Sequence, residues 1–409
     1  MPMAMSELMS RWFHQPRQLA LALVVVMTAG CGGSTAPATP TGSPALTPAA
    51  SEPAAATDGG TAAPATATPA STAPVATPPP TEGASPEPEP EPSAPEASLT
   101  PTAWRELAAG GEVPGPREDH TWTLDPAGDS AYLFGGRNRC DASDELWRYD
   151  LAAGTWTRLA AAGAPPARFG HVAVWAEGVG LVIWSGQVGS TFFSDIWAYD
   201  PAADAWRELA ATGDVPPARY GSCGGIGPDG RLWISHGFTA DQGRFSDTRA
   251  YDFSSDSWAD VTVDGRRPVE RCLHDCLWTA DGRLLVYAGQ TTGVPAIGDL
   301  WALDPQAATW TRADGPEPPA RQLYALASVG DSAFVFGGGS EDQQMLNDLW
   351  RLDLAELTWS QPQLSGSGPS ARAGATLLAD PARSRLLLFG GTTGDAELND
   401  LWELSLDLP

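Results

Sequence analysis

Six arginines recur at nearly constant spacing through the C-terminal three quarters of the chain, and together they could bind an anion. They are Arg117, Arg168, Arg219, Arg271, Arg321 and Arg372. The planar guanidinium group pairs with carboxylates and phosphates through two parallel hydrogen bonds. A residue that stands in every copy of a repeat more often has a structural role, because a binding site rarely needs sixfold repetition. We therefore expect each arginine to bond the carbonyls of neighbouring loops and to hold two repeats together.

Histidines follow three of these arginines at a spacing of three residues. His120, His171 and His274 occupy this position. A zinc site needs three or four ligands that converge on one point, and three equivalent positions in separate repeats give no such cluster. The sequence therefore predicts structural histidines and no metal site.

Polar residues break the repeat in its second, third and fourth copies. Gln187, His236 and Gln290 take the place of the plain glycine pair, and Arg249 replaces a tryptophan. Breaks in a repeat's own rule are where a functional site is most often found. With His274, these four residues predict a ligand-binding patch at one mouth of the domain. Neutral drift in a degenerate repeat explains the same departures, and the sequence favours drift over a site.

Four of the five cysteines lie in the repeated part of the chain. Cys272 and Cys276 would be roughly 13 Å apart on an extended strand, which is too far for a bond between them. Of the two remaining pairings, Cys223 with Cys276 is favoured, because the two lie at nearly equal depth on adjacent inner strands. Cys140 with Cys272 would then need a loop to cross the mouth. Free thiols are the alternative.

The stretch from 321 to 359 shows which elements must position these residues. Apolar runs and turn residues predict four strands, namely 322–329, 333–336, 349–352 and a short segment around Trp359. Gly337-Gly338 lets the backbone leave the second strand at angles that a side chain would forbid. One such antiparallel sheet cannot bury both of its faces, so the copies must stack on one another.

Six copies with four strands each, at a period of about 50 residues, are the signature of a β-propeller. The glycine pair, the aromatic beside it and the spaced tryptophans make residues 102–409 resemble the kelch-repeat family. The sixth copy ends at Pro409 without a fourth strand, whereas the segment around Trp104 is similar to that around Trp206. We therefore expect an all-β, six-bladed kelch-type β-propeller whose ring is closed by an N-terminal outer strand around Trp104.

The first hundred residues predict an anchor and a tether. Residues 1–31 have the features of a signal peptide, in which an apolar run of about a dozen residues is too short to span a bilayer. Its small residues before Cys31 resemble the lipobox of bacterial lipoproteins, which implies lipidation of Cys31. An ordinary secretory signal is the alternative. Residues 32–101 are rich in Ala, Pro, Thr and Ser and predict a disordered linker. We expect a lipid-anchored, extracytoplasmic protein at a bacterial outer membrane or cell surface.

The net charge and the motifs of the chain disfavour nucleic-acid binding and several kinds of catalysis. The net charge of -26 argues against a nucleic-acid partner, which needs a basic face. The chain has no nucleophile elbow, phosphate loop or metal-ligand motif, so no catalytic residue and no cofactor is predicted. The family resemblance also suggests galactose-oxidase-like copper enzymes, which the lack of a Tyr-His pair disfavours, and sialic acid mutarotases, which stay the alternative. We favour a monomeric binding module that recognises a protein or carbohydrate through the mouth.

Overall fold

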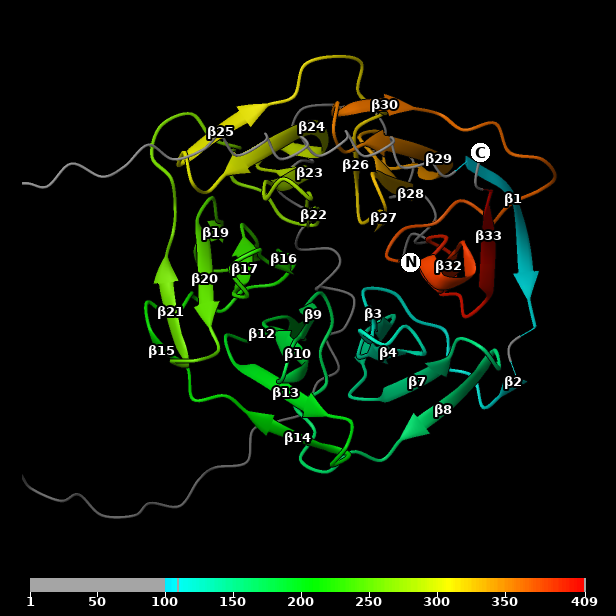
Figure 1. Ribbon diagram of the computed structural model, residues 1–409, viewed down its shortest axis with the longest axis horizontal. Helices are drawn as coiled ribbons and strands as arrows, with labels where there is room; N and C mark the ends of the chain where they lie inside the picture. The colour runs from blue at the N-terminus through cyan, green and yellow to red at the C-terminus, as the bar shows by residue number, and fades with distance from the viewer. Residues whose placement is uncertain (1–99, 109, 408–409) are drawn as a thin grey trace, which may run out of the picture. The chain divides into compact units, whose positions relative to one another are not determined.

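The computed structural model describes residues 100–108 and 110–407, and these form six four-stranded antiparallel sheets arranged as blades around a common axis (Figure 1). In every blade the first strand lies innermost and the fourth outermost. The predicted all-β fold and its kelch-type repeat are confirmed. No helix in these residues has the length and apolar character that crossing a membrane requires.

The first three blades follow one another along the chain, and each runs outwards from its innermost strand. Blade one contains β3 (Thr121–Leu124), β4 (Ser130–Phe134), β7 (Leu146–Asp150) and β8 (Thr155–Leu159). Blade two contains β9 (Val172–Ala176), β10 (Gly180–Trp184), β13 (Ile196–Asp200) and β14 (Ala205–Glu208). Blade three contains β16 (Cys223–Ile226), β17 (Leu232–Ser235), β20 (Thr248–Asp252) and β21 (Ser257–Asp260).

The second half of the ring is built in the same way. Blade four contains β22 (Asp275–Trp278), β23 (Leu284–Thr291), β24 (Val294–Asp304) and β25 (Thr309–Arg312). Blade five contains β27 (Ala325–Val329), β28 (Ser332–Ser340), β29 (Met345–Asp353) and β30 (Thr358–Ser360). Blade six contains β31 (Thr376–Asp380), β32 (Arg385–Phe389), β33 (Leu401–Asp407) and β1 (Thr100–Leu107), with the short 3-10 helix η2 (Pro381–Arg383) at its inner turn.

Further short strands lie in the loops between and within the blades. β2 (Gly110–Gly111) and β15 (Thr212–Gly213) pair in parallel with the outer strands of blades one and three, and β26 (Arg321–Gln322) links blades four and five. Three small hairpins extend the loops between second and third strands. They are β5 (Arg137–Asn138) with β6 (Asp141–Ala142), β11 (Gln187–Val188) with β12 (Thr191–Phe192), and β18 (Phe238–Thr239) with β19 (Gly243–Arg244).

Stacking of the blades explains the continuous apolar runs of the second strands. All residues of β10 are buried, and so are all but the last residue of β28. A strand that packs against a neighbour on both faces cannot alternate polar and apolar residues. The four strands predicted between 322 and 359 are confirmed as β27 to β30.

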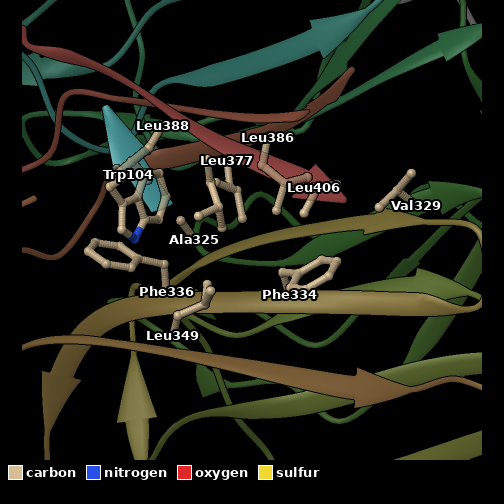
Figure 2. Packing of buried hydrophobic residues seen from close by; sticks show 12 residues of the cluster. Trp104, Ala325, Val329, Phe334, Phe336, Leu349, Leu377, Leu386, Leu388 and Leu406 are labelled. Atoms are coloured by element: carbon tan, nitrogen blue, oxygen red, sulfur yellow. The ribbon is translucent and has the colours of Figure 1, made fainter. Parts of the chain in front are cut away.

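The sixth blade takes its outer strand from the N-terminal side of the repeats, as predicted. β1 pairs antiparallel with β33, in a register that places Trp104 opposite Leu404. The Trp104 ring packs edge-on against Phe336 of blade five at a centroid distance of 5.3 Å (Figure 2). β1 begins at Thr100, two residues before the expected boundary at 102. The ring therefore has no unpaired strand edge between its first and last blades.

Backbone hydrogen bonds connect all six blades around the axis. Two residues after each repeated arginine, an N–H group donates to the equivalent carbonyl of the preceding blade over 2.8 to 3.1 Å. The six residues, all with φ between 52° and 64°, are Asp119, Gly170, Gly221, Leu273, Leu323 and Gly374. The last bond, from Asp119 to Gly374, returns to the start. This hydrogen-bonded ring fixes the blades to one another at the mouth.

The six repeated arginines are structural. Each is at most 4% exposed, and each Nη1 donates to the carbonyl of the first residue of the glycine-pair position in its own blade, over 2.9 to 3.0 Å. Each also pairs with the carboxylate two residues before the third-strand tryptophan, a position that Arg249 holds in blade three; the six are Glu145, Asp195, Asp247, Asp299, Asp348 and Asp400. The side chains thus bind their own blade. Backbone atoms of the arginines make the predicted contact between blades, as where Gly136 donates to the Arg168 carbonyl.

Candidate binding site at the mouth of the propeller

The mouth is the end of the ring where the inner strands begin and where the loops between second and third strands lie. The residue after each repeated arginine pairs there with the residue after the glycine pair. The pairs are Glu118 with Arg137, Phe169 with Gln187, Tyr220 with Phe238, Cys272 with Gln290, Gln322 with Gly339, and Ala373 with Thr392. Side chains at these positions therefore decide what the mouth can bind.

Four aromatic side chains gather on one side of the mouth, and sequence reasoning missed them. Tyr220 lies 6.1 to 6.3 Å, between ring centroids, from each of Phe169, Phe192 and Phe238. All but Phe169 are partly exposed. Two signals could have revealed them, because Phe169 and Tyr220 each follow a repeated arginine directly, and Phe192 and Phe238 lie in the loops that face them.

Two arginines border these aromatic rings. The guanidinium of Arg137 lies 4.5 Å from the Phe169 centroid, and that of Arg244 lies 5.5 Å from the Phe238 centroid. Such cation–π contacts keep long side chains extended over the rings. We call the six residues Phe169, Phe192, Tyr220, Phe238, Arg137 and Arg244 the mouth cluster.

An acidic pair lies behind Arg137. Its Nη2 is 3.1 Å from Glu118 Oε1 and 3.0 Å from Asp119 Oδ2, and both carboxylates are nearly buried. Burial and the neighbouring Asp119 raise the pKa of Glu118 to about 8, against the opposing charge of Arg137. Glu118 is therefore mostly protonated at neutral pH. Burial also raises the pKa of Asp119, against the opposing charge of Arg137.

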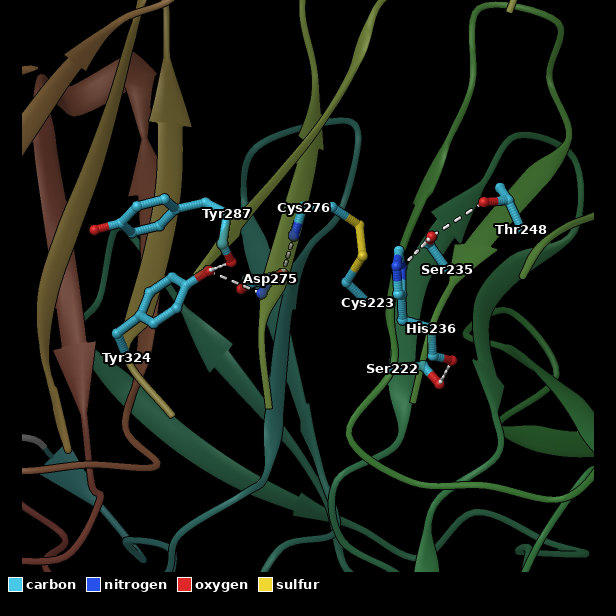
Figure 3. Close-up of a disulfide and its surroundings, with 9 residues drawn as sticks. All are labelled: Ser222, Cys223, Ser235, His236, Thr248, Asp275, Cys276, Tyr287 and Tyr324. Atoms are coloured by element: carbon cyan, nitrogen blue, oxygen red, sulfur yellow. Dashed lines mark hydrogen bonds between the residues drawn. A yellow bond between two sulfur atoms is a disulfide. The ribbon is translucent and has the colours of Figure 1, made fainter. Parts of the chain in front are cut away.

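The two predicted histidines lie together but inside the protein. His236 and His274 are 1% and 6% exposed, and their ring centroids are 5.3 Å apart. His236 Nδ1 is bonded to Ser235 Oγ at 2.7 Å (Figure 3). Burial lowers the pKa of His236, and it lowers that of His274 to about 3. Both imidazoles are thus neutral at physiological pH and form no exposed patch.

The other predicted site residues lie in two places. Gln290 is at the mouth, where its Oε1 accepts from Arg244 Nη2 at 2.6 Å. Gln187 is also there, and its Nε2 donates to the Gly189 carbonyl at 3.3 Å. Arg249 is on the third strand and donates to Asp247 at 3.0 Å. The tryptophans at the equivalent position donate to the equivalent carboxylate in the other five blades. Arg249 thus takes over a tryptophan's structural bond.

The backbone angles show that the glycine pair was aligned one residue too late in blades two and four. Its two positions have positive φ in every blade, and in blades two to four the first position is held by Ser185, His236 and Ala288. Gln187 and Gln290 therefore stand one residue after the pair and do not replace it. This register explains why His236 points inward, whereas both glutamines reach the mouth.

A disulfide joins Cys223 to Cys276 with their Cα atoms 5.5 Å apart, which is the pairing that the sequence favoured (Figure 3). The bond connects the inner strands of blades three and four. Cys272 keeps a buried free thiol, so the accompanying bond between Cys140 and Cys272, which would have needed a loop to cross the mouth, is not formed. Cys31 and the expected tether lie outside the described residues.

A central cavity of about 290 Å³ lies inside the hydrogen-bonded ring and is lined by all six blades. Two of the repeated histidines have structural partners there, as expected: His120 bonds Thr376 and His171 bonds Thr121, both at 2.8 Å. Burial raises the pKa of Asp275, on the wall of this cavity, to about 7. Within residues 100–108 and 110–407, no three His, Cys, Asp or Glu side chains are grouped so that they could hold a metal ion.

Comparisons with known proteins agree with this architecture. The family model of the KLHDC2/KLHL20/DRC7 Kelch-repeats domain matches residues 97–289 and 258–408. The bovine Rab9 effector protein with kelch motifs is 33% identical over 207 residues, which cover 46% of this chain and 52% of that protein. The Drosophila melanogaster homolog of leucine-zipper-like transcriptional regulator 1 is 27% identical over 290 residues, covering 68% of this chain and 24% of that protein.

A rice relative, Adagio-like protein 1, is 27% identical over 289 residues, which cover 65% of this chain and 45% of that protein. The chain thus spans about half or less of the length of these relatives. The family model, in contrast, extends over the whole of the six-bladed ring. On this match and on its six blades, the chain belongs to the kelch-repeat family.

Proposed function

We propose that this chain is a binding module that holds a partner protein at the mouth of its propeller. Kelch-repeat domains are protein-interaction modules, and the observation that carries the proposal is the mouth cluster. Aromatic residues and arginine are enriched where protein interfaces gain most of their binding free energy. Here they come from three adjacent blades and form one partly exposed surface.

The frame beneath the mouth cluster supports this role. The hydrogen-bonded ring and the buried arginines fix the start of every inner strand. A surface on a rigid frame loses little conformational entropy when it binds, and that saving strengthens binding. The apolar rings suit an apolar anchor on the partner. Arg244, already bonded to Gln290, suits a carbonyl or carboxylate beside that anchor.

Truncation of the mouth cluster is expected to abolish capture of the partner. The full chain would be immobilised and used to capture proteins from a cell-envelope extract, and the captured proteins would be quantified by mass spectrometry. Hot-spot aromatics contribute at least about 2 kcal/mol each when lost, so Phe192→Ala with Phe238→Ala should weaken the capture of a specific partner by about 1,000-fold.

Val215→Ala is the matched control, because Val215 is an exposed apolar side chain outside the mouth cluster. It should leave the captured proteins unchanged. Equal capture by the double variant and the wild type would contradict the proposal.

We further propose that a lipid on Cys31 anchors the module outside the cytoplasm, at a bacterial outer membrane or cell surface. The apolar run before Cys31 and the small residues next to it support this anchor. Cells fed a labelled fatty acid should incorporate the label into the wild-type chain, whereas Cys31→Ser should abolish labelling and release the protein into the soluble envelope fraction. Labelling that survives the substitution would contradict the anchor. The mutarotase alternative stays a prediction that a sugar-anomer assay would check.

A further inference from the structure

A second cavity lies away from the mouth cluster, between blades three and four, which are neighbours in the ring (Figure 1). Its volume is about 630 Å³, within the size range of small-molecule pockets. The turns around Asp229, Gly282 and Gln306 line one end, and the segment 261–264 lines a side. We call it the blade three–four pocket.

The pocket exists because blade four lacks a pair of side chains that other blades have. In blades two and three, a tyrosine at the end of the third strand donates to an aspartate in the following turn: Tyr199 to Asp204 at 2.9 Å and Tyr251 to Asp256 at 2.7 Å. Blade four has Leu303 and Ala308 at these positions, and both line the pocket.

The other blades fill the same space in different ways. Blade one keeps a tyrosine, Tyr149, and blade five places Leu357 in its turn against the core. Among the described blades with a turn between third and fourth strands, blade four alone combines leucine with alanine. The cavity is thus a local departure from the repeat.

Two tryptophans form the aromatic wall of the pocket. The rings of Trp233 and Trp278 are 5.4 Å apart and nearly perpendicular. The Trp278 Nε1 is buried without a hydrogen-bond partner. Gly227 makes room for the first ring, since a Cβ there would lie 2.8 Å from Trp233 Nε1. The wall therefore offers apolar ring surface on which a ligand can pack.

Hydrogen-bond donors and acceptors surround the two tryptophan rings. Asp229 accepts from Trp233 Nε1 at 3.1 Å and pairs with Arg231 at 2.7 Å. Asp264 and Gln306 add a carboxylate and an amide. A ligand with many hydroxyl groups can use donors and acceptors alike while its C–H faces pack on the rings.

A cationic ligand fits the pocket less well. The Arg231 guanidinium already lies 5.2 Å from the Trp233 centroid, so the aromatic face next to it carries a positive charge. The same guanidinium neutralises the Asp229 carboxylate. Asp264 is the one further charged residue of the lining; its carboxylate disfavours an anionic ligand, so a neutral ligand fits best.

We propose that the blade three–four pocket binds a neutral saccharide, one to three sugar units long. This site is independent of protein capture at the mouth, because none of the mouth-cluster residues lines it. The chain would then hold a glycan and a protein at separate places on one ring.

Restoring the missing pair is the decisive test. The full chain with Leu303→Tyr and Ala308→Asp should fill the pocket and keep the fold, because blades two and three already contain this pair. Ala308 has φ 50°, a conformation that aspartate adopts more readily than alanine, so the melting temperature should not fall. Wild-type chain on an array of di- and oligosaccharides should retain a neutral glycan, and calorimetric titration with that glycan should show at least tenfold weaker binding to the double variant.

The variant with Phe192→Ala and Phe238→Ala is the control and should bind the glycan as the wild type does. Three outcomes would overturn the proposal: no glycan retained by the wild type, equal binding by the filled variant, or displacement of the bound glycan by choline, which would indicate a cation site.

Discussion

Deletion of residues 102–108 is expected to lower the melting temperature of the propeller sharply. The deletion removes most of β1, so that β33 is left as an unpaired edge and the sixth blade loses its outer strand. It also removes Trp104, which is 8% exposed and packs with Phe336, Leu349 and Leu404 in one core cluster (Figure 2). Loss of a buried tryptophan side chain alone costs about 3–5 kcal/mol, a large part of the total stability of a typical domain.

Thermal unfolding followed by circular dichroism would measure this effect, with Trp104→Ala as the smallest version of the change. Arg105→Ala is the control within the same strand. The Arg105 side chain is 68% exposed in its ion pair with Glu403, and such surface pairs contribute about 0–1 kcal/mol. A deletion variant that melts at the wild-type temperature would show that the ring does not depend on β1.

Asp348→Ala is expected to destabilise the protein by about 3–5 kcal/mol, the range found when one partner of a buried ion pair is removed. Arg321 is fully buried and gives two hydrogen bonds of 2.9 Å to Asp348. The substitution leaves its charge inside the blade, bonded to the neutral carbonyls of Pro319 and Gly337 but without a carboxylate. The indole of Trp350 loses its acceptor as well.

Chemical denaturation would measure the loss, and Glu317→Ala is the control. Glu317 pairs with Arg312, whose side chain is 44% exposed, so its loss should cost less than about 1 kcal/mol. Adding Arg321→Met to Asp348→Ala should recover part of the lost stability, because the stranded charge is then gone. Equal effects of Asp348→Ala and Glu317→Ala would refute the structural role of the arginines.

The same ion pair gives a pH dependence with a defined sign. Burial raises the pKa of Asp348, but the hydrogen bonds and charge of Arg321 outweigh this effect and hold that pKa below its ordinary value. The folded-state pKa is thus lower than the unfolded one. The stabilisation is therefore complete above the unfolded pKa of about 4 and is lost as the pH falls towards the folded value.

The fold could be predicted from the sequence because the same pattern of arginine, glycine pair and tryptophans recurs in six copies, which can be aligned with one another. The period of about 50 residues defined the blades, and the absence of a fourth strand after 402 indicated that Trp104 closes the ring. Each of these inferences needs only the order of residues along the chain. The pairing of β1 with β33 in the structure confirms that Trp104 lies in the outer strand of the sixth blade.

The candidate site could be predicted only in part, because a site depends on where side chains point. His236 stood out as a departure, but it occupies a glycine position whose backbone turns its side chain inward. The mouth cluster was missed for the opposite reason. Phe169 and Phe192 belong to the second repeat, Tyr220 and Phe238 belong to the third, and each is an ordinary residue there. Only the stacking of blades brings them together.

The blade three–four pocket could not be predicted from the repeat alignment either, although Leu303 replaces a tyrosine there. Leucine at that position also occurs in blades five and six, as Leu352 and Leu404. It leaves a cavity only where the following turn carries a residue as small as Ala308. The consequence of one residue therefore depends on its neighbour in space, which the repeat alignment does not show.

The pairing of β1 with β33 also determines when the protein can finish folding. Thr102 and Ser405 are hydrogen-bonded although they are 303 positions apart. A ribosome adds about 5–20 residues per second, so β1 waits roughly 15–60 s for its partner strand. Until then blade six cannot be completed and the ring cannot close.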